Sequence, residues 1–214
     1  HLFSSSGSIS LSPDGKWIAS LLENQSKEFL LSVTGADGTV QKYFKLDLDI
    51  DREQLFLLQV SWSRDSKHIL VPVKEGFGII DTETGEMQKY SDPNADEFAC
   101  RTFSPNSRKV YYVAGYKVGE PNSKVVKIAL NTFALDNRKT KTITFLPKLE
   151  GVGQLSISPN GKMVLLRGIV KDVPEDEKSA LIFWDGKTQK IIETDRWLQT
   201  PFYTDADIIF EKKL

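Results

Sequence analysis

The chain has 214 residues, of which 40% are hydrophobic and 27% are charged, a composition typical of a globular protein. Its 28 basic and 29 acidic residues give a formal net charge of −1, which argues against binding to nucleic acid or to an anionic membrane. No apolar run approaches the roughly 18 residues of a membrane-spanning helix. The single cysteine, Cys100, excludes an intrachain disulfide and a cysteine-based metal cluster.

A short phrase recurs five times along the chain. It is clearest at Ser12–Ala19 and Ser158–Leu165, where a Pro-Asp-Gly or Pro-Asn-Gly core precedes an apolar stretch. Weaker copies stand at Ser63–Leu70, Ser104–Tyr111 and Tyr203–Phe210. The copies begin 51, 41, 54 and 45 residues apart, and periods of this size with strand-like segments between them are typical of β-propeller blades.

Each copy is predicted to be a hairpin turn between the first two strands of a unit, because Pro, Asp or Asn, and Gly each favour tight-turn backbone. Ser66 and Ser107 replace the glycine in two copies, so we expect strain or another turn type there. A large apolar residue ends the first strand of every unit and predicts a packed face: Leu11, Trp62, Phe103, Ile157 and Phe202.

Third and fourth strands follow in four units, and no segment has the apolar period of a helix. The predicted pairs are Phe29–Val33 with Val40–Leu46, Gly78–Thr82 with Glu86–Tyr90, Val125–Leu130 with Lys141–Phe145, and Ala180–Trp184 with Lys190–Glu193.

On these phrases and the Asp81–Glu86 turn, the chain resembles the WD40-like β-propeller repeats of the TolB type. The resemblance implies one all-β propeller domain over residues 1–214, built from four-stranded antiparallel blades, of which about four and a half are present. We expect the blades at about 7–46, 57–90, 98–146, 153–193 and, incomplete, 197–214. The resemblance also favours a periplasmic or secreted location.

A propeller ring closes with 4 to 8 four-stranded blades, and the last unit here has only two strands. We therefore expect a fragment of a longer propeller with six or seven blades. The alternative is a five-bladed ring that closes imperfectly.

Residue types that carry catalysis are sparse. The two histidines are the terminal His1 and His68, and His68 aligns with Trp17 and Met163, which predicts a packing role. Cys100 is interpreted as a packed small residue. Alternating carboxylates at Asp47–Asp51 lack the glycine and glutamate of a calcium loop, so we interpret them, like the acidic stretch 172–177, as solvated. We expect no catalytic residue, no metal site and no cofactor.

Arg101 is the strongest candidate for a binding role, because uncharged residues (Ile9, Val60, Leu155 and Thr200) occupy its equivalent positions. A buried arginine must find carboxylates or water, so we expect either an ion pair between blades, the favoured alternative, or contact with a ligand. Further candidate contact residues lie in the long connections after the second and fourth strands of the units: Tyr116, Lys117, Arg196 and Trp197.

The favoured function is a non-catalytic propeller scaffold that binds a protein or peptide partner through the face that carries the long loops. The alternative is the propeller domain of a prolyl-oligopeptidase-type serine peptidase whose catalytic domain lies outside this chain. A small-molecule enzyme with a site in the channel is least favoured, because its inner strands lack convergent carboxylates. Neither nucleic-acid binding nor membrane insertion is expected, and the sequence indicates no oligomeric state.

Overall fold

The protein is described by a computed structural model that covers residues 3–24, 26–39, 41–46, 48, 60–118, 126–170, 179–194, 202–203 and 208–209. Strands and turns account for these residues, and no helix long and apolar enough to cross a membrane occurs among them. The chain divides into two compact units, His1–Pro93 and Asn94–Leu214, called here the first and second units.

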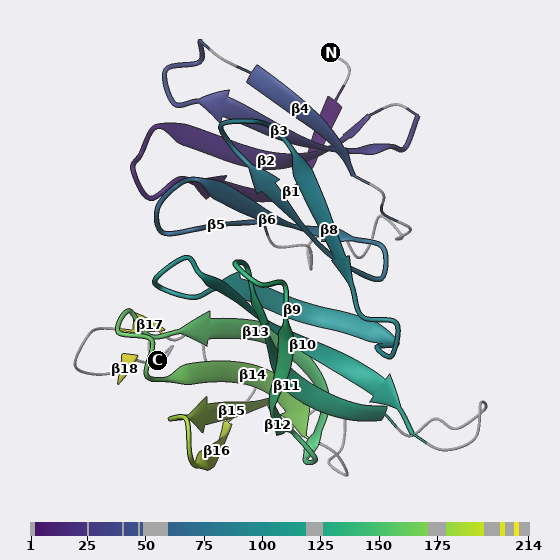
Figure 1. Cartoon of the computed structure of the whole chain (residues 1–214), viewed down its shortest axis with the longest axis vertical. Coiled ribbons are helices and arrows are strands. Elements are labelled where there is room, and N and C mark those ends of the chain that lie inside the picture. The colour runs from purple at the N-terminus through teal and green to yellow at the C-terminus, as the bar shows by residue number, and fades with distance from the viewer. Residues whose placement is uncertain are drawn as a thin grey trace. The chain divides into compact units, whose positions relative to one another are not determined.

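The first unit holds two four-stranded antiparallel sheets in which each strand pairs with the next along the chain (Figure 1). The strands of its first sheet are β1 (Phe3–Leu11), β2 (Trp17–Asn24), β3 (Phe29–Gly35) and β4 (Gln41–Leu46). Those of its second sheet are β5 (Ser61–Trp62), β6 (His68–Val73), β7 (Gly76–Asp81) and β8 (Met87–Ser91).

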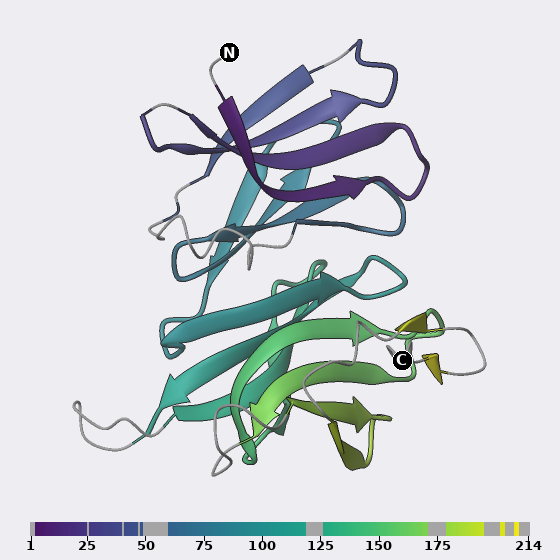
Figure 2. The same ribbon diagram turned by 180° about the vertical axis from the view of Figure 1, so that it is seen from behind.

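The second unit repeats this arrangement, and its two sheets can be followed from both sides in Figures 1 and 2. The strands of its first sheet are β9 (Glu97–Phe103), β10 (Lys109–Lys117), β11 (Val126–Ala134) and β12 (Thr140–Phe145). Those of its second sheet are β13 (Leu149–Ile157), β14 (Val164–Val170), β15 (Ser179–Trp184) and β16 (Gln189–Thr194). A short pair, β17 (Phe202–Tyr203) and β18 (Ile208–Ile209), follows.

The recurring phrase forms the turn between the first two strands of each full sheet, as predicted. In the second copy, the Ser63 hydroxyl donates to Asp65 Oδ1 (2.6 Å) and accepts from the His68 N–H (2.9 Å). The Lys67 N–H completes the turn by donating to Asp65 Oδ1 at 3.1 Å. The same three bonds recur around Ser12, Ser104 and Ser158. A buried serine hydroxyl therefore links the two ends of each turn.

The two copies without glycine keep the same turn and adopt a strained backbone. Ser66 and Ser107 have φ values of 59° and 57°, close to the 73° and 71° of Gly15 and Gly161 at the equivalent positions. The turn requires the left-handed region whatever the residue, which explains the glycine in the clearer copies. The expected strain is confirmed, and the turn type is unchanged.

Ser63→Ala should lower the free energy of unfolding by about 1–3 kcal/mol, because it removes the hydroxyl that the partly buried N–H of His68 and the carboxylate of Asp65 share as a partner. Ser63 is fully buried. Urea denaturation measures the loss, with the exposed Ser26→Ala in the same unit as control. Equal stability of the two variants would show that the hydroxyl does not hold the turn.

A hydrophobic core lies between the two sheets of the first unit. Apolar residues from β2 and β3 pack against β5, β6 and β7, notably Leu21, Leu31, Val33, Trp62, Ile69 and Val71. Hydrogen bonds between described residues also join the sheets: Trp62 Nε1 donates to the Ser10 carbonyl (3.1 Å), the Asp14 N–H donates to Ser66 Oγ (3.1 Å), and Lys42 Nζ donates to the Thr82 carbonyl (3.2 Å). Apolar burial of this kind is the main stabilising term for stacked sheets.

The second unit has an equivalent core between its own two sheets. It is built from both sheets by Cys100, Val113, Leu130, Leu155, Val164, Leu166 and Ile182. Burial raises the pKa of the Cys100 thiol to about 12, so the reactive thiolate is disfavoured. The prediction of a packing role for Cys100 is confirmed.

The large apolar residues at the end of each first strand differ in exposure. Trp62 and Phe103 are buried, as predicted, whereas Leu11 is 59% exposed and its neighbour on the same face, Ile9, is 70% exposed. These two side chains lie on the face of the β1–β4 sheet that points away from the core of the first unit. The prediction of a packed position at Leu11 is therefore wrong for this unit.

Candidate functional site

Arg101 lies on β9, the edge strand of the β9–β12 sheet, directly opposite Tyr112 of β10. Only 9% of the residue is exposed. A register shift occurs immediately before it, where Ala99 and Cys100 stand opposite a single residue of β10. This is a β-bulge, and bulges change the direction of neighbouring side chains. Similar register shifts occur in β1 and β13, so the bulge is a feature of the repeated sheet. The arginine, in contrast, is present in this sheet and not at the equivalent positions of the others.

The guanidinium of Arg101 has no partner among the described residues. Its Nε is buried without a hydrogen-bond acceptor, and no described carboxylate forms an ion pair with it. The ion pair favoured by the sequence is therefore not found in the described part of the chain. Burial lowers the pKa of Arg101 from its ordinary value to about 10, a shift that corresponds to roughly 3 kcal/mol of destabilisation of the charged form.

The fold does not require a charge at this place. The equivalent residues in the second sheet of each unit are Val60 and Leu155, which are buried and apolar. An unpaired buried cation is among the least favourable groups a protein can hold, whereas a bound carboxylate would supply both acceptors that a guanidinium fork fits. Arg101 is therefore a buried cation that no described residue neutralises and that the repeat does not require.

Tyr116 and Lys117 lie within β10, where they pair with Lys127 and Val126 of β11. Their prediction as loop residues is wrong, because the hairpin continues to the last residues of β10. Side chains alternate along a strand, so Tyr116 shares the face of Tyr112 and Arg101, and Lys117 points to the other face. The structure thus groups Arg101 with Tyr116 on one face and separates Lys117 from both.

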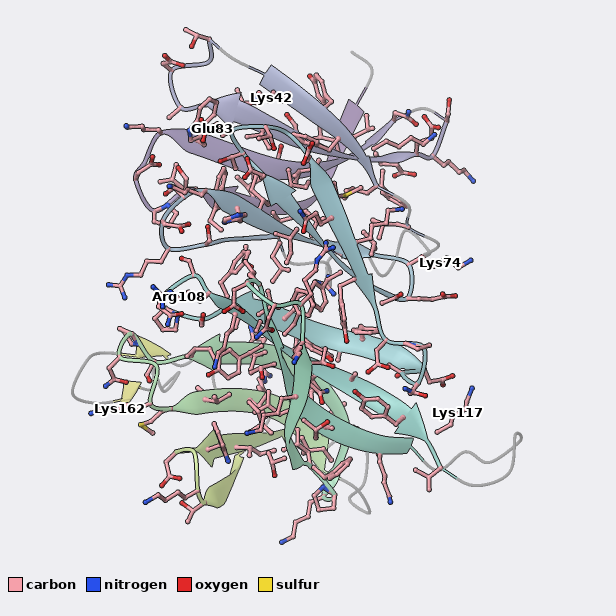
Figure 3. All side chains as sticks on the ribbon, viewed as in Figure 1. Lys42, Lys74, Glu83, Arg108, Lys117 and Lys162 are labelled. Atoms are coloured by element: carbon pink, nitrogen blue, oxygen red, sulfur yellow. The ribbon has the colours of Figure 1, made fainter. Side chains whose placement is uncertain are left out.

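Lys117 marks the end of the β9–β12 sheet that carries the long connections (Figure 3). Its Nζ lies 2.6 Å from Asp96 Oδ1, just before β9, and both side chains are partly exposed. The Asp96 N–H also donates to the Gly115 carbonyl at 2.8 Å. This end, defined by Asp96, Glu97, Tyr116 and Lys117, is called the long-loop end. Arg196 and Trp197 lie outside the described residues.

The described residues contain little that could perform catalysis. No group of three or more His, Cys, Asp or Glu side chains in the described ranges could hold a metal ion. His68 Nε2 lies 4.0 Å from Asp81 Oδ2 on the neighbouring strand. The nearby Ser63 hydroxyl accepts from the backbone N–H of His68 and donates to Asp65, which is the geometry of a turn and not of a nucleophile with its base.

Comparison with known proteins shows the fold. No protein-family model and no curated protein matches the sequence. Among solved structures, TolB from Acinetobacter baumannii matches 88% of this chain and 43% of its own chain, with 15% identity and a TM-score of 0.57. The β-propeller domain of the trilobed protease from Pyrococcus furiosus matches 95% of this chain and 62% of its own, with 18% identity and a TM-score of 0.67.

A further match is a chain of the nidogen/laminin complex, with 94% of this chain and 70% of that chain covered, 8% identity and a TM-score of 0.61. The present chain spans less than two thirds of the TolB and protease chains that it matches. Together with the four antiparallel four-stranded sheets, these likenesses confirm a TolB-like all-β propeller of four-stranded blades. Function does not follow from this fold.

Proposed function

We propose that this propeller is a non-catalytic scaffold that binds a protein or peptide partner through its long-loop end, with Arg101 contacting a carboxylate of that partner. The observation that carries the proposal is the buried Nε of Arg101, which has no hydrogen-bond partner among the described residues, at a position where the second sheet of each unit has an apolar residue. Tyr116 supports it, because this half-buried aromatic lies on the same face toward the long-loop end, and tyrosine and arginine are enriched at binding hot spots.

The likeness to known propellers is compatible with such a role. One similar chain was solved as part of a complex of two proteins, nidogen and laminin. Rigid blades with variable connections form the kind of surface on which proteins place binding residues.

A selection from a displayed random-peptide library on the immobilised chain tests the proposal. We expect the wild type to enrich peptides that contain carboxylates, and Arg101→Met to bind the selected peptides at least roughly tenfold more weakly, since a lost charge-assisted hydrogen bond is worth about 1.5–3 kcal/mol. Hydrogen exchange of the wild type with a selected peptide should protect Asp96–Phe98 and Tyr116. Failure to enrich any peptide, or equal binding by Arg101→Met, would refute the proposal.

A second candidate is the propeller domain of a serine peptidase, which the likeness to the trilobed-protease propeller favours. The two candidate functions differ in whether a catalytic domain accompanies the propeller outside this chain. An α/β-hydrolase segment in the reading frame that encodes the chain would favour the peptidase, and Arg101 would then face the substrate peptide.

A further inference from the structure

The short turns at one end of the second unit carry a concentration of positive charge. These turns span residues 104–109, 135–139, 158–163 and 185–188 and contain two acidic residues, Asp136 and Asp185. Their basic side chains, which we call the basic turn end, are all exposed: Arg108, Lys109, Arg138, Lys139, Lys162 and Lys187.

The turns that carry these residues are neighbours in space. The Leu135 N–H donates to the Arg108 carbonyl at 3.0 Å, which places the turn after β11 beside the turn after β9. A Cβ built on Gly161 would lie 3.8 Å from the Pro105 ring, so the turn after β13 contacts the same group. In Figure 3, Arg108 and Lys162 lie at one end of the second unit and Lys117 lies at the other.

The equivalent turns of the first unit have the opposite charge. Residues 12–17, 36–40, 63–68 and 81–86 contain three basic residues and six acidic ones, including Asp14 and Asp65 of the recurring phrase. In the second unit the phrase has Asn106 and Asn160 at those positions. Part of the difference in charge between the two units therefore comes from one turn position, which is Asp in the first unit and Asn in the second.

The turn itself does not require this choice. Asp14 Oδ1 accepts from the Ser12 hydroxyl (2.6 Å) and the Lys16 N–H (3.1 Å). Asn160 Oδ1 accepts the equivalent two bonds at 2.8 and 2.9 Å. Because both residue types build the same turn, the fold does not explain why the second unit has amides and exposed cations together. Clustered like charges repel one another, which leaves binding as the physical reason for the cluster.

We propose that the basic turn end is a second interaction surface, which binds an acidic segment of a protein partner. Carboxylates are the complementary group for clustered lysine and arginine side chains. An acidic protein fits better than nucleic acid, because these turns contain no aromatic side chain on which a base could stack and the whole chain has a net charge of −1. The surface lies at the opposite end of the β9–β12 sheet from Lys117 and does not depend on the binding proposed for the long-loop end.

Fluorescence anisotropy with a labelled oligoglutamate peptide tests this surface. Arg108→Gln/Lys162→Gln should weaken binding roughly tenfold, and added salt should weaken wild-type binding, because these contacts are exposed charge pairs. The matched control is Lys16→Gln/Lys67→Gln, which removes the same charge at the same phrase position in the two copies of the first unit and should change the affinity less than about twofold.

Three results would overturn the proposal. The first is no binding of oligoglutamate, or an equal loss in the two double variants, which would reflect net charge alone. The second is tighter binding of single-stranded DNA than of oligoglutamate, lost in the same variant, which would make the partner a nucleic acid. The third is loss of oligoglutamate binding in Arg101→Met, because it would show that the two surfaces are one. Retained binding by Arg101→Met supports the separate surface even if the proposal for the long-loop end fails.

Discussion

Gly76→Ala is expected to destabilise the protein by about 3 kcal/mol or more. Gly76 begins β7 and pairs with Ser91 at the end of β8. A Cβ at this position would lie 1.9 Å from the Tyr90 carbonyl oxygen and 2.9 Å from its carbonyl carbon. Because the obstacle is backbone, relief requires β8 to move away from β7, which would also disrupt the contact between the Phe77 and Tyr90 rings, whose centroids are 4.8 Å apart.

Urea denaturation followed by tryptophan fluorescence measures this loss. The matched control is Gly151→Ala on β13, where an added Cβ has no atom within 4 Å and the change in the free energy of unfolding should stay within about 0.5 kcal/mol. A Gly76→Ala variant as stable as the control would show that the close pairing at the start of β7 is wrong.

Arg101→Met is expected to raise the free energy of unfolding by about 1–3 kcal/mol at neutral pH. The folded state lowers the pKa of Arg101 from its ordinary value to about 10, so above this pH the unfolded chain binds more protons than the folded one. The destabilisation is thus fully present below pH 10 and is relieved as the pH rises from there toward the ordinary pKa of arginine. Methionine removes the charge and is about as long as the aliphatic stem of the arginine side chain.

Arg101→Lys is the control, because it keeps a cation at the buried position and should not gain stability. Calorimetric melting at pH 7 compares the three proteins. A melting temperature of Arg101→Met below that of the wild type would mean that Arg101 has a stabilising partner, and the interpretation of a free binding group would be wrong.

The turns of this fold could be predicted from sequence because their chemistry is local. The serine of each phrase, its Asp or Asn two residues later and the following glycine determine the hydrogen bonds within six residues. The backbone strain at Ser66 and Ser107 could also be predicted, because serine replaces glycine at these two turn positions. From the repetition of this turn, the all-β propeller architecture could be predicted as well.

Features that depend on pairing between distant segments could not be predicted in this way. β10 extends through Tyr116 and Lys117 because β11 offers partners, which the local sequence does not indicate. Aligned positions suggested a packed Leu11, but exposure depends on which face of a sheet is covered. The absence of a partner for Arg101 within the described part of the chain likewise depends on which side chains the paired strands present.

The basic turn end was missed because its residues are spread over four turns that lie between positions 104 and 188 of the chain. A signal was present in the phrases, since Asp14 and Asp65 become Asn106 and Asn160 in the second unit. A comparison of the charges at equivalent turn positions in the two units, in place of the net charge of the whole chain, would have identified the basic turn end.

The most direct test of the central claim, that Arg101 is retained for binding and not for folding, is the melting temperature of the wild type and Arg101→Met with and without a peptide selected on the wild type. Without peptide we predict that Arg101→Met melts higher. A saturating peptide should raise the wild-type melting temperature through preferential binding to the folded state and raise that of Arg101→Met less, because this variant binds the peptide more weakly. An equal rise in both proteins, or a lower melting temperature of Arg101→Met before any peptide is added, would contradict the claim.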